Sequence, residues 1–254
     1  MERFIGKTVW ITGAETQIGQ ALARRFAAEG AQLLLSGVNI PPDGFAAHCY
    51  GANPLTEADA HAALALVKRL DVLVTANRKI KKLPLLEAEA DDFDDIIDAN
   101  LTCVFNAARA AAGKIGRGNS GAIVFVGSIH GEKPTGATFL HSVASGGLNM
   151  LTREAALDFG RSGIRVNLLR AGPVEGDDIA FESELSGIYY DMRTKIPRGR
   201  PASPDEIASA ALMLCTDDAS FINGAILTAD GGFLSHYVDA DMDTRWAIGF
   251  GGEN

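Results

Sequence analysis

Short, almost wholly apolar segments alternate with helical patterns along the chain, and this alternation limits the possible folds more than any other feature. The apolar segments are TVWIT at Thr8–Thr12, QLLLS at Gln32–Ser36, VLVT at Val72–Thr75, AIVFV at Ala122–Val126, RVNLL at Arg165–Leu169 and ILTA at Ile226–Ala229. Strands that are apolar on both faces are typical of parallel sheets covered by helices on both sides. Strand and helix alternation also requires right-handed crossovers. The sequence therefore predicts an α/β fold with one doubly wound parallel sheet and helices on both faces.

The helical patterns and the irregular segments complete this outline. A helix is expected from Gln17 to Gly30, and two longer patterns cover Asp91–Lys114 and Ser142–Phe159. No repeat, low-complexity tract or linker interrupts the chain, so residues 1–254 are expected to form a single domain. The segment 174–201, rich in charge and glycine, is a candidate lid over a cleft, and 233–254 is a candidate C-terminal tail.

Charge and cysteine content exclude several classes of function. The chain has 23 Lys and Arg against 32 Asp and Glu, a net charge of −9, and no basic cluster that would bind nucleic acid. The three cysteines, Cys49, Cys103 and Cys215, have neither metal-ligand spacing nor the pattern of a disulfide framework. No run of about 20 apolar residues predicts a membrane span, and the first residues have no secretory pattern. We expect a cytoplasmic protein with no metal site and no nucleic-acid or membrane partner.

An ordered series of short motifs carries a family resemblance. The motifs are Thr12-Gly13 with Ile18-Gly19, Leu70–Val74, Asn100-Leu101, Gly127-Ser128, Arg165–Asn167, Arg200-Pro201 with Pro204–Ala208, Asn223-Gly224 and Asp230–Gly232. With these motifs the chain resembles the short-chain dehydrogenase/reductase family over nearly its whole length. That resemblance implies a Rossmann-type sheet that binds a nicotinamide cofactor and a Ser-Tyr-Lys-Asn group that moves hydride and proton. Because a fold does not by itself grant a function, each of these positions is compared with the family pattern.

The phosphate loop departs from the family pattern TGxxxGxG. The chain reads TGAETQIG, which retains Gly13 and Gly19 but has Gln17 at the middle glycine. That glycine has no side chain, so the dinucleotide can come close to the backbone. A glutamine side chain would occupy the same space. Glu15 adds a carboxylate beside the place of a diphosphate. We expect this loop not to bind a dinucleotide.

Other positions implied by the family to contact the cofactor are also altered. Gly37 stands where NAD-dependent members place an acid for the adenosine ribose. The family's Asn-Asn-Ala-Gly corresponds to residues 75–78, with Arg78 in place of its glycine. Arg78 would either block the cofactor or pair with a phosphate. Gly176 stands where the family has a nicotinamide-binding threonine. Together these changes predict that the chain binds no cofactor.

The catalytic group is half preserved. Asn100 and Ser128 remain at the family's asparagine and serine positions, whereas His141 and Ser145 replace its tyrosine and lysine. In active members the lysine lowers the pKa of the tyrosine, which otherwise lies near 10. His141 and Ser145 supply neither the phenol nor the cation, and so no catalytic residue is expected.

The favoured hypothesis is therefore a non-catalytic structural or regulatory subunit. The resemblance implies that this chain assembles with an active paralogue into a heterotetramer. The assembly would be a hetero-oligomeric NAD-dependent dehydrogenase of the 3-hydroxyacyl-CoA type. NAD and an acyl-CoA substrate would bind to the partner. The two long helices, the last strand and the last helix would form the contacts. One alternative is a non-redox enzyme, such as a lyase, hydratase or hydrolase, that uses His141 and Ser128. Another is a redox enzyme in which Tyr189 or Tyr190 reaches in from the lid.

Overall fold

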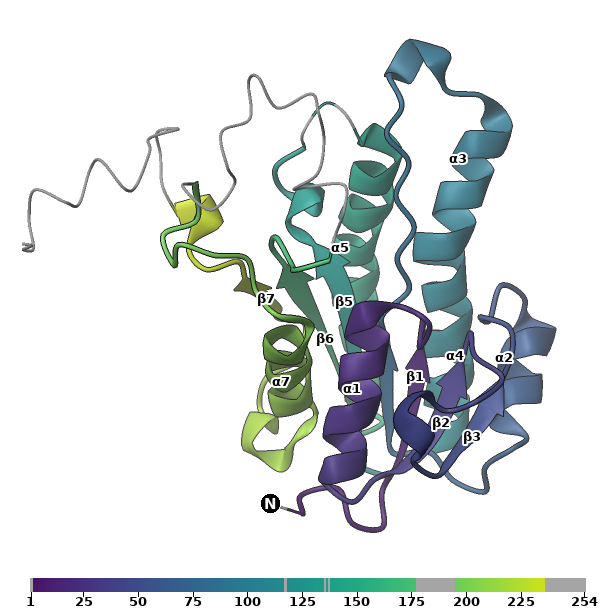
Figure 1. Cartoon of the computed structure of the whole chain (residues 1–254). Coiled ribbons are helices and arrows are strands. Elements are labelled where there is room, and N and C mark those ends of the chain that lie inside the picture. The colour runs from purple at the N-terminus through teal and green to yellow at the C-terminus, as the bar shows by residue number, and fades with distance from the viewer. Residues whose placement is uncertain (1, 117, 135, 137, 177–194, 236–254) are drawn as a thin grey trace, which may run out of the picture.

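Seven parallel strands form one sheet with helices on both faces (Figure 1). The computed structural model describes residues 2–116, 118–134, 136, 138–176 and 195–235. The strand order is β3-β2-β1-β4-β5-β6-β7, so the direction of progression reverses between β1 and β4. The strands are β1 Thr8–Thr12, β2 Gln32–Ser36, β3 Ala47–Tyr50, β4 Val72–Thr75, β5 Gly121–Ser128, β6 Ile164–Ala171 and β7 Ile226–Ala229. The predicted doubly wound parallel sheet is confirmed.

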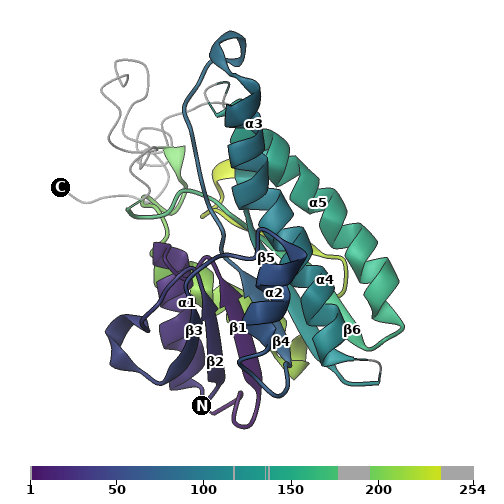
Figure 2. The ribbon, with the colours of Figure 1, turned by 90° about the vertical axis from the view of Figure 1, so that its right-hand side faces the viewer.

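Helices cover the sheet in two layers. The first layer holds α1 (Gln17–Ala28) and α7 (Pro204–Cys215), and the second holds α2 (Glu57–Leu64), α4 (Cys103–Ile115) and α5 (Phe139–Gly160). Figure 2 shows α2, α4 and α5 along one side of the molecule, with α3 (Ala90–Ile97) continuing the line of α4. Side-chain caps stabilise the N-terminal ends of both helices in the first layer. The Thr16 hydroxyl accepts the Gly19 N–H at the start of α1, and Ser203 and Glu206 form a capping box on α7.

The core divides between the two faces because successive side chains of a strand point to opposite sides. In β1, Val9 and Ile11 pack in the cluster under α1 and α7, whereas Trp10 packs in the cluster under α2, α4 and α5. All three side chains have no solvent exposure. A sheet buried on both faces in this way explains why the strand segments are so uniformly apolar.

Three features differ from the outline drawn from the sequence. Strand β3 was not predicted, because its sequence AHCY is half polar and lies partly exposed at the sheet edge. Helix α2 was not predicted, because its buried face consists mostly of alanines, which give a weak apolar pattern. The expected helix Asp91–Lys114 is α3 and α4 joined by a π turn at Asp98–Thr102.

The predicted lid and tail fall mainly outside the described residues. Val174, the first residue of the candidate lid, forms a bridge with Ala202, the residue that follows the lid. Among the described residues no helix is both long and apolar enough to cross a lipid bilayer.

Candidate functional site

The residues at the family's catalytic positions come from three neighbouring elements and line one small cavity. Ser128 ends β5, Asn100 lies in the π turn before α4, and His141 and Ser145 stand near the start of α5. All four are buried, with no more than 5% of their surface exposed. The cavity that they enclose measures about 20 Å³, which is room for about one water molecule.

The two retained family residues hydrogen-bond to the backbone. The Asn100 amide donates to the carbonyls of Lys79 and Ile96, each at 2.8 Å, and its oxygen accepts the Lys79 N–H at 2.9 Å. The Ser128 hydroxyl accepts the N–H of His130 at 3.2 Å. Both side chains therefore hold loops in place, and their presence is explained by the scaffold alone.

His141 is buried without a polar partner. Its side chain is 4% exposed, and neither ring nitrogen has a hydrogen-bond partner among the described residues. Burial, followed by the cations of Arg78 and His130, lowers its pKa to about 3. The Lys79 backbone has a smaller, opposite effect and raises this pKa. Its position relative to the ring does not meet the geometry of a hydrogen bond. His130 packs edge-on at a ring distance of 5.6 Å, and its pKa is lowered by burial as well. Near neutral pH His141 is therefore an uncharged, buried ring.

The two retained glycines of the phosphate loop are required by the backbone itself. A Cβ at Gly19 would lie 2.1 Å from the carbonyl oxygen of Gly13. A Cβ at Gly13, whose φ is +68°, would lie 2.5 Å from the backbone of Ala76 at the end of β4. These contacts are far inside van der Waals distance, so both glycines are needed for the loop to pack. Retention of Gly13 and Gly19 therefore does not indicate that a cofactor binds.

The exposed side chain of Gln17, the first residue of α1, reaches the segment that follows β6. In dinucleotide-binding folds the pyrophosphate approaches this helix N-terminus. Here the Gln17 amide lies against Gly176, in the segment that follows β6, where a Cβ would come within 2.3 Å of both amide heteroatoms. Gly176 has a φ of +78° and no side chain, and both properties allow the amide to reach it. The two altered positions noted in the sequence thus contact each other.

Glu15 and Asn53 occupy the region beside the end of β2. One oxygen of Glu15 would lie 1.9 Å from a Cβ at Gly37, so the carboxylate covers that glycine. The other oxygen accepts the Asn53 amide at 2.8 Å, and Asn53 in turn accepts the Gly13 N–H at 2.8 Å. The sequence singled out Glu15 and Gly37 separately but gave no sign of Asn53. A carboxylate from the phosphate loop therefore stands over the position at which the family places its ribose acid.

Arg78 lines two adjoining cavities. One is the small cavity around His141, and the other measures about 520 Å³ and lies beside Asn53 and Asp98. The charge of Arg78 contributes to the lowered pKa of His130 and of His141. The long cationic side chain of Arg78 thus lies at the position where the family has a glycine, whose backbone would be accessible to the cofactor.

Comparison with known proteins decides the family. Residues 13–234 match the family described as Enoyl-(Acyl carrier protein) reductase. The chain is 35% identical to the cis-4-hydroxycyclohexanecarboxylate dehydrogenase of Sinomonas cyclohexanicum, over 92% of this chain and 99% of that protein. The chain belongs to the short-chain dehydrogenase/reductase family.

Solved structures of similar proteins have the same fold. A gluconate 5-dehydrogenase from Burkholderia cenocepacia J2315, solved with NADP and tartrate, superimposes with a TM-score of 0.83 at 29% identity, covering 92% of this chain and 98% of that one. The TT0495 protein of Thermus thermophilus gives a TM-score of 0.83 at 29% identity, covering 91% of this chain and 100% of that one. This family member therefore shares the fold of these solved structures over more than 90% of its length.

The two tyrosines of the candidate lid lie outside the described residues. They are Tyr189 and Tyr190, considered as relocated catalytic groups. Within the described ranges no group of three or more His, Cys, Asp or Glu side chains is arranged to hold a metal ion.

Proposed function

We propose that this family member is a non-catalytic subunit of a hetero-oligomeric NAD-dependent dehydrogenase of the 3-hydroxyacyl-CoA type. An active paralogue would carry the NAD, the acyl-CoA substrate and the chemistry. The observation that carries the proposal is the state of His141, which stands at the tyrosine position as a neutral, buried ring with no hydrogen-bond partner among the described residues. At the tyrosine position such a ring supplies no phenol, and its lowered pKa keeps it from acting as an acid near neutral pH.

The side chains over the cofactor cleft support the same proposal. The Gln17 amide on Gly176 and the Glu15 carboxylate on Gly37 occupy places at which a dinucleotide would meet backbone and ribose. We infer that the residues present do not fit a nicotinamide dinucleotide, and no reaction step is assigned to this chain.

Two apolar surfaces support assembly. The first is carried by exposed apolar side chains of α4 and α5: Phe105, Val143, Met150 and Leu157. The second surrounds α7 and β7 and consists of Met213, Phe221, Ile222 and Leu227. Exposed apolar patches are typical of protein interfaces. A heterotetramer needs two such surfaces, one for the paralogue and one for a second copy of this chain.

Cofactor titration tests the first part of the proposal. We expect the isolated chain to show no saturable binding of NAD(H) or NADP(H) up to about millimolar concentration, which corresponds to a binding free energy weaker than about −4 kcal/mol. Gln17→Gly is the matched variant, because it removes the amide that covers Gly176. Calorimetry with both cofactors is the measurement. Low-micromolar affinity in the unmodified chain would refute the proposal.

Co-expression tests the second part. An active paralogue with the Tyr-x-x-x-Lys pair and the complete glycine loop, encoded next to this chain, is expected to co-purify with it as a heterotetramer in native mass spectrometry. As a finer identity we propose the degenerate subunit of the (S)-2-(α-hydroxybenzyl)succinyl-CoA dehydrogenase of anaerobic toluene degradation, for which that paralogue would carry the activity. A stable homotetramer that ignores the paralogue would contradict the subunit role.

The non-redox alternative has less support. A hydrolase or lyase built on Ser128 and His141 needs a hydrogen bond between nucleophile and base. Neither ring nitrogen of His141 has a partner in the described part of the chain, and Ser128 instead accepts the His130 N–H.

A further inference from the structure

Three polar side chains on the small cavity around His141 have hydrogen-bonding capacity that the described part of the chain does not use. Neither ring nitrogen of His141 has a hydrogen-bond partner there. The Ser145 hydroxyl forms no hydrogen bond with a described residue. The Ser128 oxygen accepts the His130 N–H, whereas its hydroxyl proton is donated to none of these residues. Because buried polar groups are nearly always hydrogen-bonded, three such side chains on one cavity indicate a small polar ligand.

The charge of this cavity favours an anion. Arg78 lines it, and no Asp or Glu belongs to the described residues that line it. Arg78 also acts on the buried ring, because its charge helps to lower the pKa of His141. The volume of about 20 Å³ has room for about one particle of the size of a water molecule. A monatomic anion has both the charge and the approximate size that this cavity accepts.

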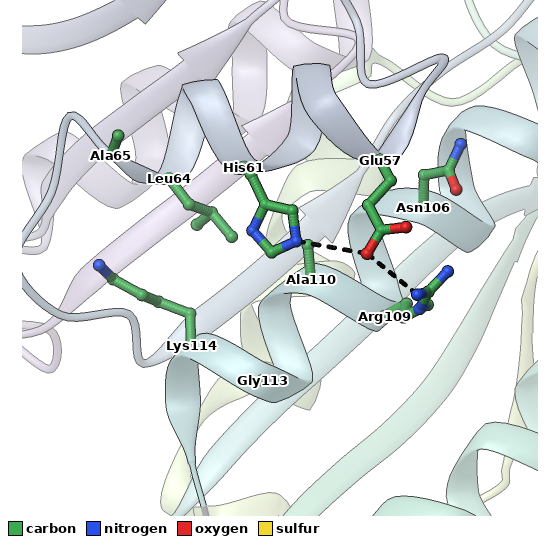
Figure 3. Close-up of a pocket in the computed structure, with 9 residues that line it drawn as sticks. All are labelled: Glu57, His61, Leu64, Ala65, Asn106, Arg109, Ala110, Gly113 and Lys114. Carbon is green, nitrogen blue, oxygen red and sulfur yellow. Dashed lines mark hydrogen bonds and ion pairs between the residues drawn. The ribbon is translucent and has the colours of Figure 1, made fainter.

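Two larger cavities contain carboxylates and differ in this respect. Figure 3 shows a groove of about 480 Å³ between α2 and α4, in which Glu57 pairs with Arg109 at 2.9 Å and with His61 at 3.5 Å. The cavity of about 520 Å³ is lined by Glu15 and Asp98 among other carboxylates. In both, carboxylates of the chain compete with an anion, whereas the small cavity has a cation and no acid among its described lining residues.

We propose that the small cavity binds a monatomic anion of about the size of chloride, together with a proton on His141. A neutral imidazole has one donor and one acceptor nitrogen, and protonation makes both nitrogens donors. The anion accepts from the His141 ring and from the hydroxyls of Ser128 and Ser145, and Arg78 supplies a second positive charge. Because one anion enters with one proton, the net charge of the buried site does not change. This site goes beyond the subunit role, because it assigns a ligand to the remnant of the catalytic group.

Anion binding is coupled to the protonation of His141. The ionisable groups that face this ring are Arg78, from the loop after β4, and His130, from the turn after β5, and both oppose its protonation. The other polar residues that line the cavity do not titrate; they are Asn77, Asn100, Ser128 and Ser145. A bound anion raises the pKa of His141, and by reciprocity a lower pH strengthens anion binding. Between the pKa of the free site, about 3, and that of the occupied site, the affinity rises about tenfold for each pH unit of acidification.

The chloride dependence of stability in the full chain tests this site. Urea denaturation is measured at pH 5 and pH 8 while sodium chloride replaces sodium gluconate at constant ionic strength. A ligand that binds only the folded chain stabilises it, so the dependence on chloride concentration gives the apparent dissociation constant. We expect this constant to be at least about tenfold lower at pH 5 than at pH 8. Equal constants at the two pH values would overturn the proposal.

Variants assign the effect to the cavity. His141→Phe removes the ring that is protonated, and Arg78→Met removes the fixed cation, so each is expected to lose the chloride-dependent part of the stability at pH 5. In Arg78→Met the ring remains, so stability should still fall as the pH is lowered. The matched control is His48→Phe, an exposed histidine on the edge strand β3, which should respond to chloride as the natural chain does. Circular dichroism checks that each variant is folded. A chloride response that persists unchanged in His141→Phe would refute the site.

Crystals of the full chain soaked in sodium bromide at pH 5 give the position of the anion independently of stability. Bromide is expected to give an anomalous scattering peak beside His141 and Ser145. Density for a water molecule at this position, without bromide, would rule out the anion site. None of these measurements involves the paralogue, so failure here is distinct from failure of the subunit proposal.

Discussion

The variant His141→Tyr is expected to show no measurable NAD-dependent turnover. A tyrosine at this position lacks the lysine that lowers its pKa, because Ser145 stands one turn further along α5. We also expect the Gln17 amide, which lies against Gly176, to oppose binding of the cofactor. Catalytic residues that act as a unit do not recover activity one at a time. We expect a rate at least about 10²–10⁴-fold below that of an active family member, which is the scale of the missing proton transfer.

A stepwise series makes this prediction specific. His141→Tyr combined with Ser145→Lys restores the proton-transfer pair, and Gln17→Gly added to both restores bare backbone at the phosphate loop. Initial rates of NAD(P)H formation with a panel of secondary alcohols and hydroxyacyl thioesters measure each step. Activity in the single variant would contradict the account, because it would mean that the cleft already binds cofactor and substrate.

The variant His141→Phe is expected to be more stable than the natural chain. The two buried ring nitrogens have no hydrogen-bond partner among the described residues, and burial of an unsatisfied polar group costs about 1–3 kcal/mol. Phenylalanine has a similar shape and no polar atoms to satisfy. We expect a gain of about 1–3 kcal/mol in the free energy of unfolding at pH 7, measured by urea denaturation. A loss of stability would show that His141 has a partner, such as a bound water, that contributes to the fold.

The same substitution should change how stability depends on pH. The pKa of His141 is about 3 in the folded chain and about 6.5 when unfolded. Between these values the unfolded chain binds a proton that the folded chain does not, so stability falls as the pH is lowered below about 6.5. Each pH unit within this window costs about 1.4 kcal/mol, or about 2 kcal/mol between pH 6.5 and pH 5.

Comparison between pH 8 and pH 5 isolates this effect. The low pKa values of Glu29 and Glu206, held down by Arg3 and Arg200, affect stability only at more acidic pH. The pKa of His130 is also lowered by burial, so His141→Phe should remove most of the slope and leave a smaller part. An unchanged slope in the variant would show that His141 is not the titrating group.

Much of the fold could be predicted because local pattern determines it. A five-residue segment such as TVWIT is apolar at every position except its terminal threonines, and only a strand covered on both faces buries such a segment. The replacements at Gln17, His141 and Ser145 were also visible, since the ordered family motifs assign each position its place. Strand β3 and helix α2 escaped prediction because their burial is supplied by neighbours in space, and their own sequences carry a weak periodic signal.

The sequence by itself predicted the parallel α/β sheet and the family, and it identified the positions at which this chain departs from the family pattern. Only the tertiary structure decided what the exchanged residues do. Gln17 and Gly176 are far apart in sequence yet lie in contact, and Glu15 reaches Gly37 with Asn53 as its support. The buried surroundings of His141 likewise come from separate elements that meet at the carboxyl ends of β4 and β5. The physical reason is that periodicity reports which face of an element is buried, whereas a pKa, a closed cleft or an unpaired nitrogen depends on atoms brought together from distant parts of the chain.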